Sequence, residues 1–133
     1  MIRLLLIVTF IFNFCIKSVA QNNQSPKDLF LLIGQSNMAG RAPLLPEDDK
    51  VIEGAFLYGS INHWIPLKNP LNIHSSIRKI ARMQKLNLGY TFAKKITETN
   101  ILNPIGLVVN ARGGTKIQAW VPGTFYYKEA VRR

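Results

Sequence analysis

The chain has 133 residues, enough for one domain at most. Its 17 Lys and Arg outnumber 7 Asp and Glu, which gives a net charge of +10. Such a charge can attract nucleic acid, but no nucleic-acid motif and no interleaving of aromatic with basic residues accompanies it, so the composition does not predict a nucleic-acid-binding protein.

Residues 1–20 have the three-part layout of a secretory signal peptide. A basic start precedes an apolar run over 4–16, and Ser18-Val19-Ala20 is a small-x-small cleavage pattern. The run is shorter than the roughly 20 apolar residues of a membrane span, although an uncleaved anchor is the alternative. We therefore expect a secreted or periplasmic protein without membrane attachment after cleavage, with a polar linker over 21–27.

The five apolar residues 29–33 predict a strand buried on both faces, as in a parallel sheet. The run stops at Gly34, and the polar residues Gln35, Ser36 and Asn37 follow at once. A serine in a tight turn past a buried strand suits a nucleophile, because the turn lifts its hydroxyl out of the sheet toward backbone N–H donors. An ordinary turn with a solvated serine is the alternative.

The middle of the chain gives weaker signals. Two prolines and an acidic cluster indicate a loop over 41–50, and glycines bound a short strand predicted at 55–58. Residues 61–72 suggest an irregular surface excursion, and 75–86 could form a basic amphipathic helix with a solvated face. The basic residues of that face are Arg78, Lys79, Arg82 and Lys85.

From residue 88 the pattern becomes regular. Leu88, Phe92 and Ile96 recur every four residues and predict a helix, and 105–109 is a second buried-strand signal followed by a glycine turn over 112–115. Short helices are expected at 116–120 and from Phe125 onward. Strands alternating with helices predict an α/β fold with a parallel sheet, and the last strand is expected at an unpaired edge. Both glycine-containing turns fall at carboxyl ends of strands, where such sheets bind ligands.

Four blocks of the sequence together resemble one enzyme family. They are Leu-Leu-Ile-Gly-Gln-Ser-Asn-Met-Ala-Gly at 31–40, Trp-Ile-Pro-Leu with Asn-Pro-Leu-Asn at 64–72, Leu-Gly-Tyr-Thr-Phe-Ala at 88–93, and the Gly-Gly-Thr-x-Ile-x-x-Trp block within 106–120. In this order they resemble the sialate O-acetylesterase and acetylxylan esterase group of the SGNH-hydrolase superfamily. The resemblance implies a flavodoxin-like parallel sheet flanked by helices, with 28–133 as the N-terminal, C-terminally truncated portion of such a domain.

The resemblance also implies roles for individual residues. Ser36 would be the nucleophile, with its own N–H and that of Gly89 as oxyanion donors, since a glycine lets an acyl carbonyl approach the backbone closely. The expected substrate pocket comprises Gln35, Asn37, Gly113, Gly114 and Thr115. A plain helix-start glycine is the alternative for Gly89. A phosphate-cradling loop is the alternative for the glycine turn, but its lysine–serine/threonine pattern is absent.

The chain departs from the family pattern in one respect that matters for catalysis. The family base is the histidine of an Asp-x-x-His, and neither this motif nor the Gln-Gly-Glu block occurs here. His63 and His74 lie in the middle of the chain, where the family has no catalytic base. A serine without a base is a weak nucleophile, so the 133-residue chain is expected to be an inactive fragment.

We therefore expect part of a secreted carbohydrate O-acetylesterase that removes acetyl groups from O-acetylated sugars of the sialic acid or xylan type. No metal and no cofactor is expected to be required. The alternative is a non-catalytic sugar-binding or interaction protein that retains part of an esterase fold.

Overall fold

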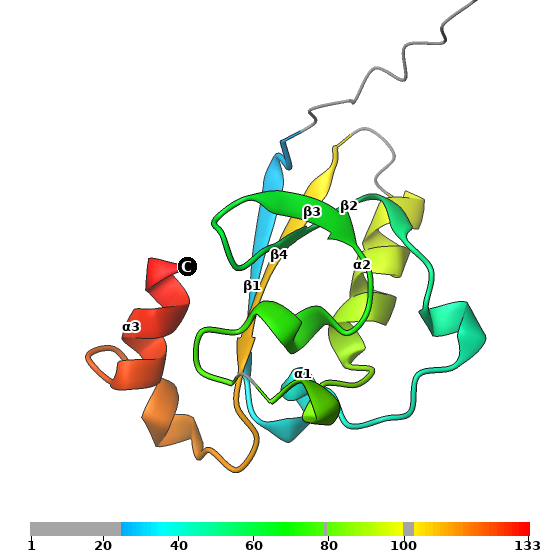
Figure 1. Ribbon diagram of the computed structural model, residues 1–133. Helices are drawn as coiled ribbons and strands as arrows, with labels where there is room; N and C mark the ends of the chain where they lie inside the picture. The colour runs from blue at the N-terminus through cyan, green and yellow to red at the C-terminus, as the bar shows by residue number, and fades with distance from the viewer. Residues whose placement is uncertain (1–24, 79, 100–102) are drawn as a thin grey trace, which may run out of the picture.

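The computed structural model describes residues 25–78, 80–99 and 103–133, so the predicted signal peptide lies outside the described residues. A four-stranded sheet has helices on both sides (Figure 1), which confirms the α/β prediction. The strands are β1 (Asp28–Gly34), β2 (Ile52–Tyr58), β3 (Trp64–Leu67) and β4 (Ile105–Ala111). The helices are α1 (Ser36–Ala39), α2 (Leu88–Thr99) and α3 (Phe125–Arg132), with short 3₁₀ turns at Pro46–Asp48, Leu71–His74, Ala81–Met83 and Ile117–Trp120.

The sheet is mostly parallel, in the order β1-β4-β2-β3. β4 pairs in parallel with β1 along its whole length and with β2 over 105–107, whereas β3 pairs antiparallel with β2. The last strand in sequence is therefore the inner partner of β1 and β2. The expectation that it lies at an unpaired edge is wrong, and β1 occupies that edge instead.

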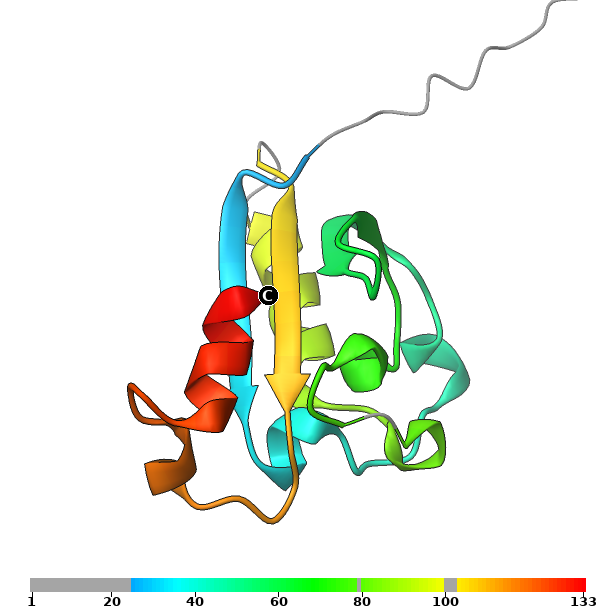
Figure 2. The same ribbon diagram turned by 60° about the vertical axis from the view of Figure 1, so that its left-hand side comes forward.

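The two strongest strand signals differ in burial. Every residue of β4 is buried except Val108, which is half-buried. In β1, Phe30 and Leu32 pack against the core, but Leu29 and Leu31 are 61% and 45% exposed. The prediction that β1 is buried on both faces is wrong for one face. Figure 1 and Figure 2 show α2 on one side of the sheet and α3 on the other.

Helix α2 confirms the predicted helix, but the face that it buries differs slightly from the predicted face of Leu88, Phe92 and Ile96. Tyr90 and Ala93 are its buried hydrophobic residues, Phe92 and Ile96 pack against the core, and Leu88 is 54% exposed. The Phe92 ring meets the Phe30 ring edge-on at a centroid distance of 5.0 Å. This contact joins α2 to the inner face of β1.

Two mid-chain predictions are wrong, those for 61–72 and 75–86, whereas the strand predicted at 55–58 lies within β2. Residues 61–72 include β3 and the fully buried Leu67 and Asn72, so this segment belongs to the core. The Trp64 ring lies over Gly106, where an added Cβ would come within 2.7 Å of two indole carbons. The predicted helix over 75–86 is reduced to the 3₁₀ turn Ala81–Met83, because Ser75 hydrogen-bonds to Asn110 at the end of β4.

Candidate active site

Ser36 lies where the sequence predicts, directly past the carboxyl end of β1. Gly34 ends the strand with φ of +140°, a backbone angle that non-glycine residues rarely adopt. Ser36 is the first residue of α1, whose backbone bonds run from Ala39 N–H to Gln35 O (2.9 Å) and from Gly40 N–H to Ser36 O (3.1 Å). Gly40 then leaves the helix with φ of +89° and lies against the Lys85 carbonyl, where a Cβ would overlap.

The Ser36 hydroxyl donates to Gln35 Oε1 at 3.0 Å, in an exposed position. Gln35 therefore contacts the candidate nucleophile directly. Asn37 is exposed and lines a hollow of about 370 Å³ together with Arg41, Asn87 and other residues. The side chains of Gln35 and Asn37, which flank Ser36, thus both lie at the carboxyl end of β1.

A second turn, at the end of β4, meets the first. The Arg112 N–H donates to Gly34 O at 2.9 Å and joins the two turns through the backbone. A Cβ placed on Gly113 would lie 3.5 Å from Ser36 Cβ and would overlap the Arg41 guanidinium. The structure therefore brings Gly113 against Ser36, and the absence of a side chain there leaves room for both neighbours.

The other two residues of the glycine turn have different positions. Gly114 has φ of +80°, and no atom lies within 4 Å of the place that a Cβ would occupy, so backbone conformation is what requires glycine there. Thr115 Oγ1 donates to Arg112 O at 2.8 Å and accepts from Trp120 Nε1 at 2.9 Å. Thr115 thus closes the turn and provides the indole N–H of Trp120 with its acceptor.

Gly89 does not offer the free donor that was expected of it. Its N–H donates to Asn87 Oδ1 at 2.9 Å, as the second helical residue of α2 does with an N-cap asparagine. An added Cβ would lie 2.7 Å from Leu32 Cδ1 and 3.1 Å from Leu71 Cδ1. In this structure close packing accounts for the glycine and its N–H donates to Asn87; the oxyanion role of Gly89 stays a prediction.

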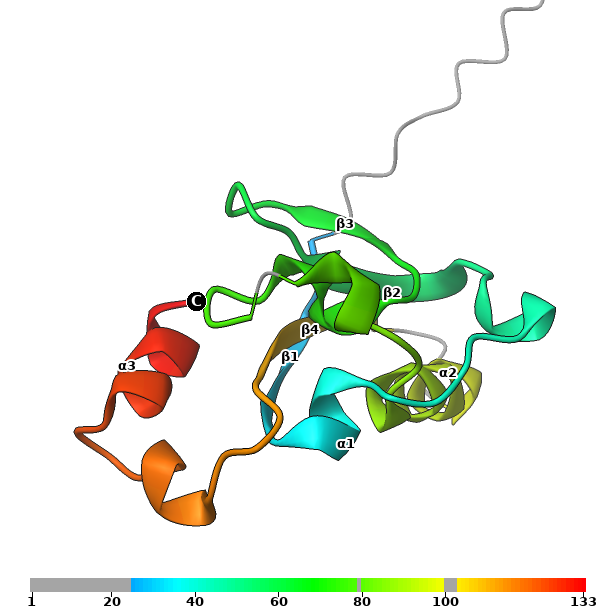
Figure 3. The same ribbon diagram turned by 60° about the horizontal axis from the view of Figure 1, so that its bottom comes forward.

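Asn87 is a residue that the sequence interpretation missed. Besides capping α2, its Nδ2 donates to Met38 O at 2.8 Å and so ties α1 to α2. Figure 3 shows α1 beside the start of α2, at the carboxyl end of β1. An asparagine immediately before the helical pattern is a recognised N-cap signal, and it could have identified this residue.

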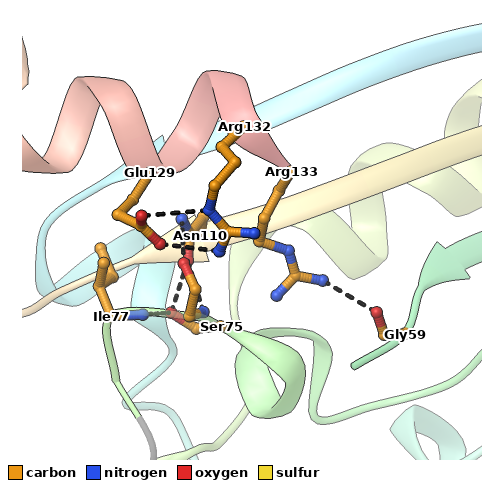
Figure 4. Close-up of polar contacts among 8 residues, drawn as sticks. Gly59, Ser75, Ile77, Asn110, Glu129, Arg132 and Arg133 are labelled. Carbon is orange, nitrogen blue, oxygen red and sulfur yellow. Dashed lines mark hydrogen bonds and ion pairs between the residues drawn. The ribbon is translucent and has the colours of Figure 1, made fainter. Parts of the chain in front are cut away.

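Asn72 and Asn110 each make polar contacts at the end of β4 that the sequence did not reveal. Asn72 accepts from the Ala111 N–H at 2.9 Å and donates to Ala111 O at 3.0 Å, as a neighbouring strand would. Asn110 Oδ1 accepts from Ser75 Oγ at 2.8 Å (Figure 4). Both asparagines are fully buried, and together they hold the end of β4, where the turn that contains Gly113 begins.

The histidines lie in a different arrangement. His74 Nδ1 and Ser60 Oγ are 2.8 Å apart, beside a hollow of about 420 Å³ that Arg133 also lines. Figure 4 shows Arg133 reaching the carbonyl of Gly59. Burial lowers the pKa of His74, and the charges of Arg133 and His63 lower this pKa further. Among the described residues, no hydrogen bond joins a histidine to Ser36.

Within the described ranges, no three His, Cys, Asp or Glu side chains converge as metal ligands would. In the same part of the chain, no helix has the length and apolar character needed to cross a membrane.

Comparison with known proteins gives consistent matches. A family model described as carbohydrate esterase, sialic acid-specific acetylesterase, matches residues 26–133. A probable carbohydrate esterase of Arabidopsis thaliana, At4g34215, is 29% identical over 136 residues, which cover 88% of this chain and 50% of the relative. The crystal structure of the Arabidopsis thaliana protein AT4G34215 matches with a TM-score of 0.70 and 25% identity, over 81% of this chain and 50% of that one. The chain thus spans about half the length of the relative.

Proposed function

The chain belongs to the carbohydrate esterase family of sialic acid-specific acetylesterases, and from this premise we propose that it carries the nucleophile of a secreted carbohydrate O-acetylesterase. The family match supports a carbohydrate esterase; the serine nucleophile, the acetylated sugar and secretion are the proposal. The substrate is an O-acetylated glycan of the sialic acid or xylan type. No cofactor enters the reaction as proposed.

The observation that carries the proposal is the meeting of two turns at the carboxyl ends of neighbouring parallel strands. Ser36 follows β1, Gly113 follows β4, and the Arg112 N–H to Gly34 O bond holds the turns together. Parallel sheets bind ligands at this edge. The side chain of Ser36 and the Arg41 guanidinium both lie beside Gly113, a residue without a side chain, at this edge of the sheet.

The proposed reaction is a two-step acyl transfer. Ser36 Oγ forms a bond to the acetyl carbonyl carbon, the carbonyl electron pair moves to oxygen, and the serine proton passes to a general base. The tetrahedral intermediate collapses with release of the sugar hydroxyl, which regains that proton. Water then attacks acetyl-Ser36 and releases acetate.

The general base is proposed to be the histidine of an Asp-x-x-His in the part of the relatives' length that this chain does not span. His74 does not fill this role in the proposal, because its Nδ1 is bonded to Ser60 and it lines a different hollow. The 133-residue chain is accordingly expected to show activity near background.

The decisive experiment uses the protein translated from the longest open frame that contains these residues. We would measure its turnover of three substrates: an aryl acetate, an O-acetylated sialic acid and acetylated xylan. Ser36→Ala is the test variant. Ser60→Ala is the matched control, because Ser60 is a serine hydroxyl bonded to a histidine at another place in the fold.

We expect Ser36→Ala to abolish turnover and Ser60→Ala to leave it unchanged. Loss of activity in Ser60→Ala with retention in Ser36→Ala would overturn the assignment of the nucleophile. Binding of the sugars without any turnover would favour the non-catalytic alternative. Secretion is tested separately: N-terminal sequencing of the exported protein should begin at Gln21.

A further inference from the structure

Arg41 lies at the candidate nucleophile, although no sequence motif drew attention to it. Its guanidinium occupies the space in front of Gly113, because a Cβ built on Gly113 would overlap Arg41 Nη2. The same Cβ would lie 3.5 Å from Ser36 Cβ. Gly113 does not have a positive φ, so space rather than backbone conformation accounts for glycine at this position. The guanidinium and the Ser36 side chain therefore share one small region.

The guanidinium is held in place by the backbone. Arg41 Nη1 donates to Gly40 O at 2.6 Å and to Met83 O at 3.2 Å. Both bonds use the same nitrogen, and Nη2, the nitrogen that faces Gly113, has no hydrogen-bond partner in the described part of the chain. None of the ion pairs among the described residues involves Arg41. The site thus contains a fixed cation with an available N–H donor and an uncompensated charge.

Such a donor has a use in the reaction proposed above. When Ser36 attacks an ester, negative charge develops on the carbonyl oxygen, and preorganised donors at that position lower the barrier. The Gly89 N–H, expected for this purpose, donates to Asn87 instead. A guanidinium remains charged at every physiological pH, so it can contribute without any proton transfer.

We propose that Arg41 is a further catalytic residue, whose Nη2 donates to the carbonyl oxygen of the bound ester as Ser36 attacks. The proposal rests on the proposed function for the identity of the reaction. It assigns a side-chain donor to the side of Ser36 that faces Gly113. The electron pair moves from the carbonyl π bond to the oxygen beside Arg41 and returns when the alcohol leaves.

The test compares Arg41→Gln with Arg82→Gln and Lys85→Gln in the longest-frame protein. Arg41, Arg82 and Lys85 all line one hollow of about 340 Å³, so the three variants remove the same charge from neighbouring positions. We expect Arg41→Gln to lower kcat on a neutral aryl acetate roughly 100-fold with little change in KM, because loss of one oxyanion donor has that effect. The two controls should retain kcat.

A second measurement separates catalysis from folding and from the identity of the substrate. A fluorophosphonate reacts with an activated serine and forms a tetrahedral adduct whose oxygen takes the oxyanion position. We expect Ser36 in Arg41→Gln to be labelled at least tenfold more slowly than in the unmodified protein, with an unchanged melting temperature, and Arg41→Lys to recover part of the rate.

The outcomes are distinct. Unchanged kcat and labelling rate in Arg41→Gln would overturn the proposal, as would equal losses in the two controls. A loss confined to substrates that carry a carboxylate would overturn it in favour of anion recognition. If the unmodified protein hydrolyses no acetyl ester, the proposed function fails, but the labelling rates still decide the role of Arg41. Absence of labelling at Ser36 in the unmodified protein would overturn both.

Discussion

Strands β1 and β4 both contain a run that predicts a buried strand, yet they differ in burial. Leu-Phe-Leu-Leu-Ile in β1 lies at the edge of the sheet with Leu29 and Leu31 exposed, whereas Ile-Gly-Leu-Val-Val in β4 lies between two neighbours and is buried. The carboxyl ends differ in the same sense. Buried asparagines hold the end of β4, while β1 leads into Ser36, a half-buried serine whose hydroxyl donates to its neighbour Gln35. One strand is a fixed support, and the other presents the candidate nucleophile.

The largest expected effect tests the difference in burial. Leu107 is fully buried in β4, so Leu107→Ala should lower the free energy of unfolding by about 3 kcal/mol through lost apolar contact and an unfilled cavity. Leu31→Ala in β1 should cost less than about 1 kcal/mol, because its side chain is already partly in water. Urea denaturation measures the free energy of unfolding of both variants. Equal losses would mean that β1 is covered in solution.

The next effect concerns the buried amide at the end of β4. Asn72→Ala removes the partners of both backbone groups of Ala111, and it should cost about 2 kcal/mol because each buried group left unsatisfied is unfavourable. Asn37→Ala, beside Ser36, is the control and should change stability by less than about 0.5 kcal/mol. Thermal unfolding followed by circular dichroism distinguishes the two. If Asn72→Ala left the stability unchanged, the end of β4 would not depend on this amide.

The glycine turn allows a finer test, since its two glycines are required for different reasons. Gly114→Ala places a side chain at a positive φ in open space, and it should cost about 1 kcal/mol of stability while turnover is retained. Gly113→Ala should displace the Arg41 guanidinium from its place beside Ser36 and lower turnover, with a smaller loss of stability because the displaced group is the end of a long side chain. Melting temperatures and aryl acetate turnover are compared in the longest-frame protein. The reverse pattern would contradict the assigned reasons.

The smallest effect is a pH dependence centred on His74. Its pKa is lowered from the ordinary value of 6.5, first by burial and then by the charges of Arg133 and His63. The unfolded chain therefore binds the proton more readily, so this contribution to stability is fully present above pH 6.5 and is lost as the pH falls through the lower folded-state pKa. His74→Asn should make the melting temperature less dependent on pH between 5 and 7. An unchanged pH dependence would contradict the assignment.

The sequence predicted the strands and helices that have strong periodic signals, and it placed Ser36 and Gly113 at the carboxyl ends of strands. It did not predict which strand lies at the edge, because an apolar run has the same pattern whether one or two neighbours cover it. Residues 61–72 were misassigned because prolines and polar residues suggested a loop, whereas Trp64 packs over Gly106 and Asn72 is buried against β4. Arg41 was missed because its contacts with Met83 and Gly113 join segments distant in sequence, whereas the N-cap signal of Asn87 was local and was overlooked.

The pairing of Asp28 with Ile105 also determines when the sheet can form during synthesis. β1 is made early, but its partner begins only about 70 residues after β1 ends, and β2 likewise has no parallel neighbour before β4. Contacts of such long sequence separation make folding slow. For a chain exported through a narrow channel, as proposed for this one, this order is an advantage, because the parallel pairing of β1 cannot form until β4 has also been made.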